Sequence, residues 1–580
     1  MLLNPPHRII ATLAFAALIW PAAAPAQERF VQQSSGAPTA QVATGHRGMV
    51  VTQDQQATRI GLDVLEHGGN AVDAAVAVGF ALAVTLPKAG NIGGGGFMLV
   101  HVAEHNENAA IDYRETAPAA TRPDIFLGPD GLADPEKSRD TGLGVGVPGT
   151  VAGLSLALDH FGSGKFTLAE LLAPAVRLAR EGITVKDDLL DSLLLAQPRL
   201  ARWPDTARIF LKPDGTAPAP GEKLMQPELA DVLETIGREG ARAFYIGPIA
   251  DKIVAAVRGA GGVMTRGDLE SYMPMVRNPI YGTYRGYEIV SMPPPSSGGV
   301  HLVEMLNILE GYPSATVGSG SAAALHLEIE AMKLAYADRA VFLGDADSVE
   351  VPIDRLISKE HAAELRARID PRQARPVPAP HPDVGTPSGG NTTHFSVVDE
   401  AGNVVANTYS LNFNFGLALV ADGTGIMLNN ELDDFAAKSG TPNAFGLVGG
   451  TANAPGPGRR PLSSMTPTIV FKDTKPVLVT GAPGGSRIIT TVLQVIVNAI
   501  DGHMSIGNAV AAPRVHDQWL PDEVLVERGL PTDKIRALTA MGHIVHSSPL
   551  FGSAHSIAVA PDALTGAADM RARGAAAAGY

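Results

Sequence analysis

A threonine that directly follows a stretch rich in proline and glycine is the first candidate for chemistry in this sequence. Thr392 comes after residues 371–391, which read PRQARPVPAPHPDVGTPSGGN and hold almost no large apolar side chains. If the chain were cut before Thr392, the freed α-amine would have a pKa near ~8 and would suit a general base. One residue would then supply both nucleophile and base. A Thr-Thr pair also begins many strands that do no chemistry, so the pattern alone leaves both interpretations open.

The residues present exclude or fail to support several other chemistries. Cysteine is absent, which excludes disulfides, thiolate nucleophiles, Cys-ligated zinc and iron–sulfur clusters. Residues 162–165 match half of a phosphate-binding loop, but Phe166 stands where Ser or Thr is needed. The chain has no Gly-x-Ser-x-Gly elbow and no His-Glu-x-x-His motif. A net charge of −14 disfavours nucleic acid as a partner. We therefore expect no metal and no cofactor.

The pattern of apolar residues predicts the elements that must position a site. Residues 58–90 are predicted to form two helices, separated at Gly68-Gly69, and the second helix has Asn70 as its N-cap. Its Ala/Val-rich sequence predicts burial on nearly all faces. Four glycines at 93–96 indicate a turn or a close approach of the backbone to a neighbour. Residues 324–340 are predicted to form an amphipathic helix.

The region around Thr392 combines a predicted linker with a predicted hairpin. Residues 371–391 cannot pack a core and are expected to be mobile. Thr392–Val398 and Val404–Leu411 flank a turn at 400–403, which indicates a β-hairpin. A linker that ends abruptly at a strand is what a cut before Thr392 requires, because the new terminus must separate from the chain before it.

The N-terminus has the pattern of a secretory signal over residues 1–26. Arg8 supplies the positive charge, Ile9–Trp20 is an apolar run too short to span a bilayer comfortably, and Ala24-Pro25-Ala26 places small residues before a mature start at Gln27. A buried N-terminal helix and an uncleaved anchor are the alternatives. The signal predicts a periplasmic or secreted protein, and no later apolar run is long enough to predict a membrane span.

The sequence Thr392–Asp399, TTHFSVVD, resembles the autoprocessing site of the γ-glutamyltranspeptidases. Further segments resemble that family in the family's order, from about residue 40 to Tyr580: EHGGNAVDAAVAVGFALAV, NIGGGGFML, DYRETAP, VPGTVAGL, SMPPPSSGG, AYADRAVFLGD, RPLSSMTPTIV and GAPGGSRIITT. The resemblance implies an α+β fold of the N-terminal-nucleophile hydrolases, an αββα sandwich with two stacked β-sheets between helical layers. It also implies self-cleavage between Asn391 and Thr392, giving a heterodimer of a large subunit, 27–391, and a small subunit, 392–580.

The resemblance further implies an enzyme that cleaves γ-glutamyl amides such as glutathione. The γ-glutamyl group would be held on the enzyme as an intermediate and passed to water or to an amino acid or peptide. The implied site residues fall into four groups. They are the nucleophile Thr392 with Ser410 as support, the oxyanion-hole glycines Gly484 and Gly485, the carboxylate-binding residues Arg114, Ser463 and Ser464, and the residues Asn412, Glu431 and Asp434, of which the two acids hold the donor's ammonium.

One motif departs from the family pattern, and two alternative functions stay open. Residues 436–449 resemble the family's lid over the donor pocket, but Phe445 stands where a tyrosine is common, so a phenolic OH that could bond Asn412 is missing. A glutaryl-cephalosporin acylase of the same fold is the alternative function. Its substrate lacks the ammonium, so the presence of Glu431 and Asp434 argues against it. A processed but inactive binding protein is the third hypothesis, against which Thr392 and the two glycines argue.

Overall fold

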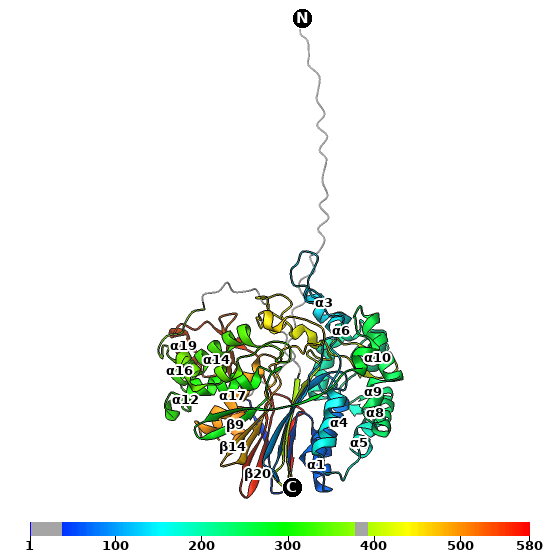
Figure 1. Ribbon diagram of the computed structural model, residues 1–580, viewed down its shortest axis with the longest axis horizontal. Coiled ribbons are helices and arrows are strands. Elements are labelled where there is room, and N and C mark those ends of the chain that lie inside the picture. The colour runs from blue at the N-terminus through cyan, green and yellow to red at the C-terminus, as the bar shows by residue number, and fades with distance from the viewer. Residues whose placement is uncertain (2–37, 378–391) are drawn as a thin grey trace. The chain divides into compact units, whose positions relative to one another are not determined.

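Two seven-stranded antiparallel β-sheets lie against each other at the centre of the fold, and helices cover both outer faces (Figure 1). The computed structural model describes residue 1 and residues 38–377 and 392–580. The predicted α+β sandwich of helix, sheet, sheet and helix is confirmed for this body of the chain. The Asn391 side of the predicted cut and the predicted signal segment lie outside the described residues, apart from Met1.

The first sheet gathers strands from both ends of the chain. Its order is β1 (Ala40–Gly45), β20 (Ala563–Asp569), β19 (His555–Ala560), β15 (Lys475–Thr480), β14 (Thr468–Lys472), β9 (Tyr287–Ser291) and β8 (Ile280–Tyr284). The second sheet has the order β21 (Ala576–Gly579), β2 (Met49–Thr52), β10 (Thr392–Val398), β11 (Val404–Ser410), β3 (Gly95–Val102), β4 (Glu107–Tyr113) and β7 (Met275–Arg277). The predicted hairpin is confirmed as β10 and β11, two interior strands of this second sheet.

A layer of helices covers the outer face of each sheet. The layer on the second sheet contains α1 (Gln55–Glu66), α2 (Ala71–Thr85), α4 (Thr150–Phe161), α5 (Leu168–Glu181), α6 (Asp187–Leu200), α7 (Pro204–Phe210), α8 (Pro227–Glu239) and α10 (Pro248–Gly259). The layer on the first sheet contains α12 (Gly298–Glu310), α14 (Ala322–Phe342), α16 (Lys359–Arg366), α17 (Arg487–Ile500), α18 (Ile506–Ala511) and α19 (Thr532–Ala540).

Shorter elements connect these layers. The short helices are α3 (Pro135–Arg139), α9 (Arg242–Tyr245), α11 (Arg266–Glu270), α13 (Ser314–Val317) and α15 (Ile353–Leu356), with 3₁₀ turns at Gly142–Gly144, Glu431–Asp434 and Thr451–Asn453. The short strands pair as β5 (Ile183–Thr184) with β6 (Lys223–Leu224), β12 (Val420–Ala421) with β13 (Ile426–Met427), and β16 (Val515–His516) with β17 (Val524–Glu527) and β18 (Val545–Ser548).

Side chains alternate along β10 between two separate apolar layers. Phe395 and Val397 pack with the helices over the second sheet, whereas Val398 packs between the two sheets. This is the two-residue period of a strand, and here both faces are buried because each sheet is covered on both sides. All of β10 and β11 is therefore inaccessible to solvent, which fixes their register firmly.

The helix predictions are confirmed in position, and one is wrong in character. The helix α2 begins after Asn70, which forms a capping box with Asp73, and it is buried along its whole length. The helix α14 covers the predicted 324–340, but it is not amphipathic. Residues 324–336 are all buried because the helix lies beneath other elements on every side.

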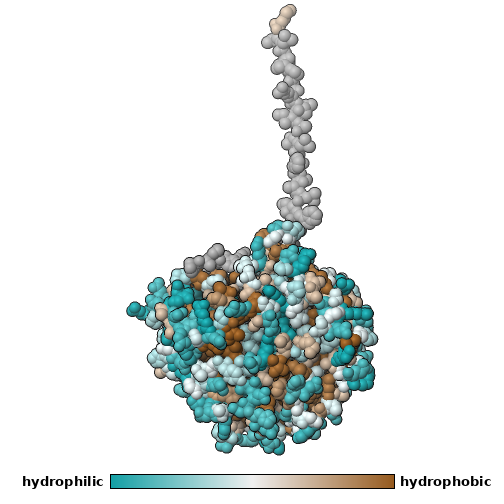
Figure 2. Space-filling model, in the orientation of Figure 1, coloured by the Kyte–Doolittle hydropathy of each residue, from teal (hydrophilic) through white to brown (hydrophobic). Residues whose placement is uncertain are grey.

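Residues 371–377, the described part of the segment predicted to be mobile, make hydrogen bonds to distant parts of the chain. The backbone N–H of Ala374 donates to the carbonyl of Met541, and that of Val377 donates to the Asp522 carboxylate at 2.9 Å. Two backbone hydrogen bonds and the buried side chain of Ala374 thus fasten residues 374–377, which composition alone cannot reveal. Within residues 38–377 and 392–580, no helix combines the length and the apolar character that crossing a membrane requires. The face in Figure 2 shows apolar side chains gathered near its middle among hydrophilic ones.

Candidate active site

Strand pairing brings the candidate nucleophile and the candidate carboxylate-binding arginine to the same end of the second sheet. Thr392 lies opposite Ser410 on β11, and Ser410 lies opposite Gly95 at the start of β3. The strand β4 ends beside the start of β3, so Arg114 emerges there directly after β4. Neighbouring strands lie about 4.8 Å apart, which puts the backbones of Thr392 and Arg114 about 14 Å apart.

The Thr392 hydroxyl begins a chain of hydrogen bonds through the predicted site residues. Its Oγ1 lies 3.4 Å from the Ser410 Oγ, to which it donates. The same Ser410 oxygen accepts the backbone N–H of Asn412 at 2.8 Å, and the Asn412 amide donates to the carbonyl of Asn430 at 2.9 Å. Asn430 directly precedes Glu431. Three predicted residues are therefore linked to one another and to the start of the acidic pair.

The glycine run at 93–96 holds this chain in place by close approach. A Cβ at Gly94 would lie 2.1 Å from the Ser410 carbonyl oxygen, so only glycine fits there. Asn91 completes the contact, because its amide donates to that carbonyl at 2.8 Å while its oxygen accepts the Gly94 N–H at 2.9 Å. The close approach predicted for these glycines is confirmed. Asn91 was not predicted, since a single asparagine in a loop gives no signal of its partners.

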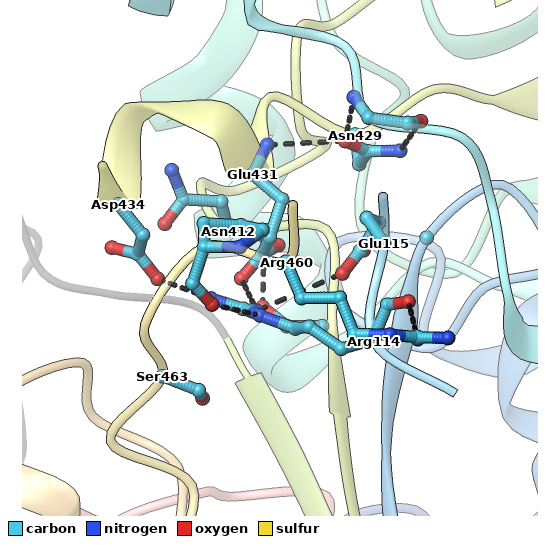
Figure 3. A network of polar contacts seen from close by, with 12 residues as sticks. Arg114, Glu115, Asn412, Asn429, Glu431, Asp434, Arg460 and Ser463 are labelled. Atoms are coloured by element: carbon cyan, nitrogen blue, oxygen red, sulfur yellow. Dashed lines mark hydrogen bonds and ion pairs between the residues drawn. The ribbon is translucent and has the colours of Figure 1, made fainter. Parts of the chain in front are cut away.

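Arg114, Glu431 and Asp434 meet in one buried cluster (Figure 3). The Arg114 guanidinium is fully buried. It donates through one terminal nitrogen to Glu431 and through the other to Asp434 at 2.6 Å. Its Nε donates to the Pro461 carbonyl at 3.1 Å. The residues assigned to the two charges of a donor thus lie against each other, and the Arg114 cation is paired with both acids.

The electrostatics of this cluster are set by burial. Burial raises the pKa of Glu431 to about 7 and also raises that of Asp434, although the attraction of Arg114 opposes both shifts. A third carboxyl, Glu115, lies 3.7 Å from Arg114 with no hydrogen-bond partner for either oxygen among the described residues. Burial raises its pKa far above the usual range, which favours its neutral form. Arg114 is thus hydrogen-bonded to two carboxyls and lies near a third.

Two residues that the sequence did not reveal, Arg460 and Asn429, form hydrogen bonds with the backbone of this cluster (Figure 3). One Arg460 nitrogen donates to the Arg114 carbonyl at 2.6 Å. Asn429 accepts the Glu431 N–H at 3.1 Å and bonds the backbone of Gly146 on both sides. Both are buried polar groups with several partners, which is how such side chains fix the backbone around a site. Their contacts come from distant parts of the chain, so no local motif reveals them.

Ser463 and Ser464 lie in an extended loop beside a second buried arginine. The Ser463 N–H donates to the Pro295 carbonyl at 2.8 Å. Arg339 on α14 donates to the Ser464 hydroxyl at 3.4 Å and to the Ser297 hydroxyl at 2.9 Å. No carboxylate lies within ion-pair distance of Arg339 among the residues described. Burial lowers the pKa of Arg339, while Asp434 attracts and Arg114 repels its charge, so it lies near the cluster.

Gly484 and Gly485 have the backbone that the predicted oxyanion hole needs. Both have positive φ, +139° and +58°, in the region that favours glycine. They lie just before α17, whose N-terminus carries a partial positive charge and whose first N–H groups, of Arg487 and Ile488, donate to the carbonyls of the two glycines. A Cβ at Gly485 would come within 2.8 Å of the Phe445 ring. Gly485 therefore lies against the tip of the predicted lid.

The predicted lid, residues 436–449, is folded down in this structure. Phe445 is 5 % exposed, its ring meets that of Phe413 edge to face at 6.1 Å, and its carbonyl accepts from Gln518 at 3.0 Å. The Asn412 amide instead bonds the Asn430 carbonyl. The Ala444 N–H also donates to the Asp433 carboxylate at 3.1 Å. The lid tip is thus held by apolar contact and by hydrogen bonds that do not depend on a tyrosine OH.

The described residues contain two further groups of possible metal ligands, and neither includes a predicted site residue. They are His326 with Glu330 and His543, and Glu304 with Asp338 and His361.

Comparison with known proteins covers nearly the whole chain. A family model described as gamma-glutamyltranspeptidase matches residues 57–579. The chain is 50 % identical over 537 residues to the glutathione hydrolase proenzyme of Escherichia coli (strain K12), covering 92 % of each protein.

Two solved structures are also similar. The crystal structure of cephalosporin acylase from Bacillus halodurans matches with a TM-score of 0.82 and 30 % identity, over 95 % of this chain and 99 % of that one. A chain of Helicobacter pylori gamma-glutamyltranspeptidase matches with a TM-score of 0.55 and 42 % identity. It covers 57 % of this chain and 94 % of its own length.

Proposed function

The chain belongs to the γ-glutamyltranspeptidase family of N-terminal-nucleophile enzymes, and we propose that it cleaves γ-glutamyl amides such as glutathione with Thr392 as nucleophile. The observation that carries the proposal is the cluster of Arg114, Glu431 and Asp434 at the same sheet end as Thr392. A γ-glutamyl donor carries a carboxylate and an ammonium on its α-carbon, and both need a partner in a buried site.

The cluster suits such a donor because the donor is a zwitterion. Its carboxylate would approach Arg114 and the hydroxyls of Ser463 and Ser464, and its ammonium would approach Glu431 and Asp434. An arginine fork matches a carboxylate with two parallel hydrogen bonds. The donor would bring one charge of each sign, so each of its charges would meet a group of opposite sign in the cluster.

The reaction would follow from the positions of Thr392 and the two glycines. In the cut chain, the Thr392 α-amine takes the proton of its own hydroxyl as Oγ1 attacks the γ-carbonyl carbon. The carbonyl oxygen becomes an oxyanion that the N–H groups of Gly484 and Gly485 stabilise. The C–N bond then breaks, the amine leaves with the proton, and an ester joins the γ-glutamyl group to Thr392. Water or an acceptor amine attacks that ester in the second half of the reaction.

Ser410 would support the nucleophile rather than replace it. Its hydroxyl lies next to Oγ1 of Thr392 and is fixed by the Asn412 N–H. A hydroxyl in this position can accept from Thr392 before attack and donate to it afterwards, which orients the reacting oxygen.

Maturation and export are part of the same proposal. The chain would lose residues 1–26 on export to the periplasm or the medium and would then cut itself between Asn391 and Thr392. Two relatives support the cut: the Escherichia coli protein is named a proenzyme, and the Helicobacter pylori chain spans only 57 % of this one. The products would stay together, because β10 lies between β2 and β11, which come from opposite sides of the cut.

The alternative of a glutaryl-cephalosporin acylase is supported by the Bacillus halodurans structure. A glutaryl group has no ammonium, however, and would leave Arg114 as the only cation paired with Glu431 and Asp434 among the described residues. We therefore prefer the γ-glutamyl donor.

The test is release of p-nitroaniline from its γ-glutamyl and its glutaryl derivatives, with and without glycylglycine. We expect the wild type to show two bands on a denaturing gel and to prefer the γ-glutamyl compound. Thr392→Ala should stay uncut and inactive, whereas Thr392→Ser, the matched control, keeps a hydroxyl and should still be cut. A preference for the glutaryl compound, or full activity in Thr392→Ala, would overturn the proposal.

A further inference from the structure

Three buried side chains outside the candidate active site, two before Thr392 in the sequence and one after it, have the composition of a metal site. His326 and Glu330 lie one turn apart on α14, and His543 follows α19. All three are buried, and their ligand atoms lie within 4.8 Å of one another. Two imidazoles and one carboxylate that converge from two elements are a frequent ligand set for zinc and similar ions.

The ring of His326 is already oriented as a ligand. Its Nε2 lies 2.7 Å from the Asp370 carbonyl oxygen, which can only accept, so Nε2 carries the proton. Nδ1 therefore presents its lone pair, and it points at Nε2 of His543 at 2.7 Å. A backbone carbonyl that fixes the far ring nitrogen is the usual outer partner of a metal-bound histidine.

The carboxylate of Glu330 is only weakly engaged. Its contacts are an N–H from Arg375 at 3.4 Å and the Lys333 ammonium at 3.8 Å. That ammonium is already held more closely, by Asp522 at 2.6 Å and by the Arg375 carbonyl at 2.7 Å. Glu330 thus has oxygen lone pairs available for another partner.

Further carboxyl groups lie close to these three residues. The carboxyl of Asp517 is buried, with one oxygen that has no hydrogen-bond partner in the described chain, and it interacts electrostatically with Lys333, Asp522 and Glu330. Three carboxyl groups thus lie around one buried ammonium, while Arg375 is exposed. A divalent ion beside Glu330 would give these groups a further positive partner.

The other candidate group lacks this character. His361 Nε2 lies 2.7 Å from Asp338 and 3.5 Å from Glu304, so its N–H is directed at two carboxylates. A ring nitrogen that donates in this way has no lone pair to offer a metal ion. This group therefore serves as the matched control.

We propose that His326, Glu330 and His543 bind a divalent transition-metal ion of the zinc class. Zn–N bonds of 2.0–2.1 Å in a tetrahedral site put two ligand nitrogens about 3.3 Å apart, so the contact of the two rings must widen by about 0.6 Å. The ion takes the place of the hydrogen between the rings, and the displaced proton moves to Nδ1 of His543, which stays neutral. Water completes the coordination.

The position suggests a structural role. His326 and Glu330 precede the Asn391–Thr392 bond and His543 follows it, so the ion would join the two sides of the proposed cut. Asp370, which orients His326, begins the segment whose Ala374 and Val377 bond to residues after the cut. The ion would therefore fasten residues 370–377 to the C-terminal part of the chain.

The experiment uses the full-length, tag-free protein, treated with a chelator and transferred to chelator-free buffer. Zn²⁺ is titrated by calorimetry, and Co²⁺ binding is followed by visible absorption. We expect one ion per chain. His326→Gln and His543→Gln should each weaken binding by about tenfold or more, because loss of an outer partner alone costs 10–100-fold. His361→Gln and His503→Gln, an exposed residue, should bind as the wild type does.

Further measurements keep the test decisive. Melting of each variant without metal shows whether it is folded. If either histidine variant fails to fold, Glu330→Gln, which keeps shape and polarity, decides in its place. Bound Zn²⁺ should also slow proteolysis within residues 370–377 in the wild type only. Absence of one-to-one binding, unchanged affinity in the folded ligand variants, or loss of binding in His361→Gln would each overturn the proposal. None of these results depends on γ-glutamyl chemistry.

Discussion

Lowering the pH from 8 to 6 should weaken the binding of glutamate but not of glutarate. Glutamate is the product of γ-glutamyl hydrolysis and keeps the ammonium of the donor, whereas glutarate lacks it. The proposed partner of that ammonium, Glu431, has its pKa raised to about 7 by burial. Only the ionised carboxylate attracts the ammonium, so binding of glutamate below pH 7 requires Glu431 to lose a proton.

The size of the effect follows from that pKa. A rise of the Glu431 pKa from 4.5 to about 7 means that the surroundings disfavour the charged carboxylate by about 3 kcal/mol in net. An ammonium in the pocket would offset that cost. About nine-tenths of the carboxyls are ionised at pH 8 and about one-tenth at pH 6. The inhibition constant of glutamate should therefore be about tenfold higher at pH 6. Protonation of Glu431 also loosens its hold on Arg114, so glutarate should bind equally well or better.

The assay is inhibition of p-nitroaniline release at each pH by each ligand. The Thr392 α-amine also titrates in this range, but it faces the γ-carboxylate that both ligands share, so the ratio of the two inhibition constants cancels its effect. Glu431→Gln removes the titrating group and should make the ratio independent of pH. A constant ratio in the wild type, or one that changes equally in Glu431→Gln, would refute the role assigned to Glu431.

Three substitutions test other parts of the site. Arg114→Ala should raise the Michaelis constant of the donor by the equivalent of about 2–5 kcal/mol and still allow self-cleavage, and an unchanged constant in the processed enzyme would remove Arg114 from the site. Phe445→Tyr restores the OH that the family resemblance pairs with Asn412. One neutral hydrogen bond, about 0.5–1.5 kcal/mol, should shift the ratio of hydrolysis to transfer two- to thirteenfold, and an equal product ratio would show that the lid tip does not control acceptor access. Arg339→Gln withdraws a charged donor from Ser464 and should raise the Michaelis constant more than it lowers kcat. The reverse pattern would contradict a positioning role.

The sequence was most informative where chemistry or backbone geometry restricts the residue type. The glycines at 93–96 indicated close approach because no side chain fits there, and the hairpin at Thr392 followed from alternation and a turn. The helix at 324–340 was wrongly predicted to be amphipathic, since its polar residues His326, Glu330 and Lys333 are buried with partners that lie far away in the sequence.

The support behind the site could not be predicted for the same reason. Asn91, Asn429 and Arg460 each bond backbone groups of segments distant in sequence. Such contacts depend on the tertiary fold, and a single asparagine or arginine has no period or spacing to reveal them. The pairing of Arg114 with Glu431 was likewise not expected, because the resemblance assigned these residues to opposite charges of a ligand and not to each other.

In the proposed reaction the γ-glutamyl group is carried on the threonine that follows the cut. The direct measurement is mass spectrometry of the smaller chain after rapid acid quenching of a reaction with a γ-glutamyl donor. We expect a chain that begins at Thr392 and gains one γ-glutamyl group on its first residue. That group should disappear when glycylglycine is added before the quench. A chain that begins at another residue, or a γ-glutamyl group on any other side chain, would contradict this reaction.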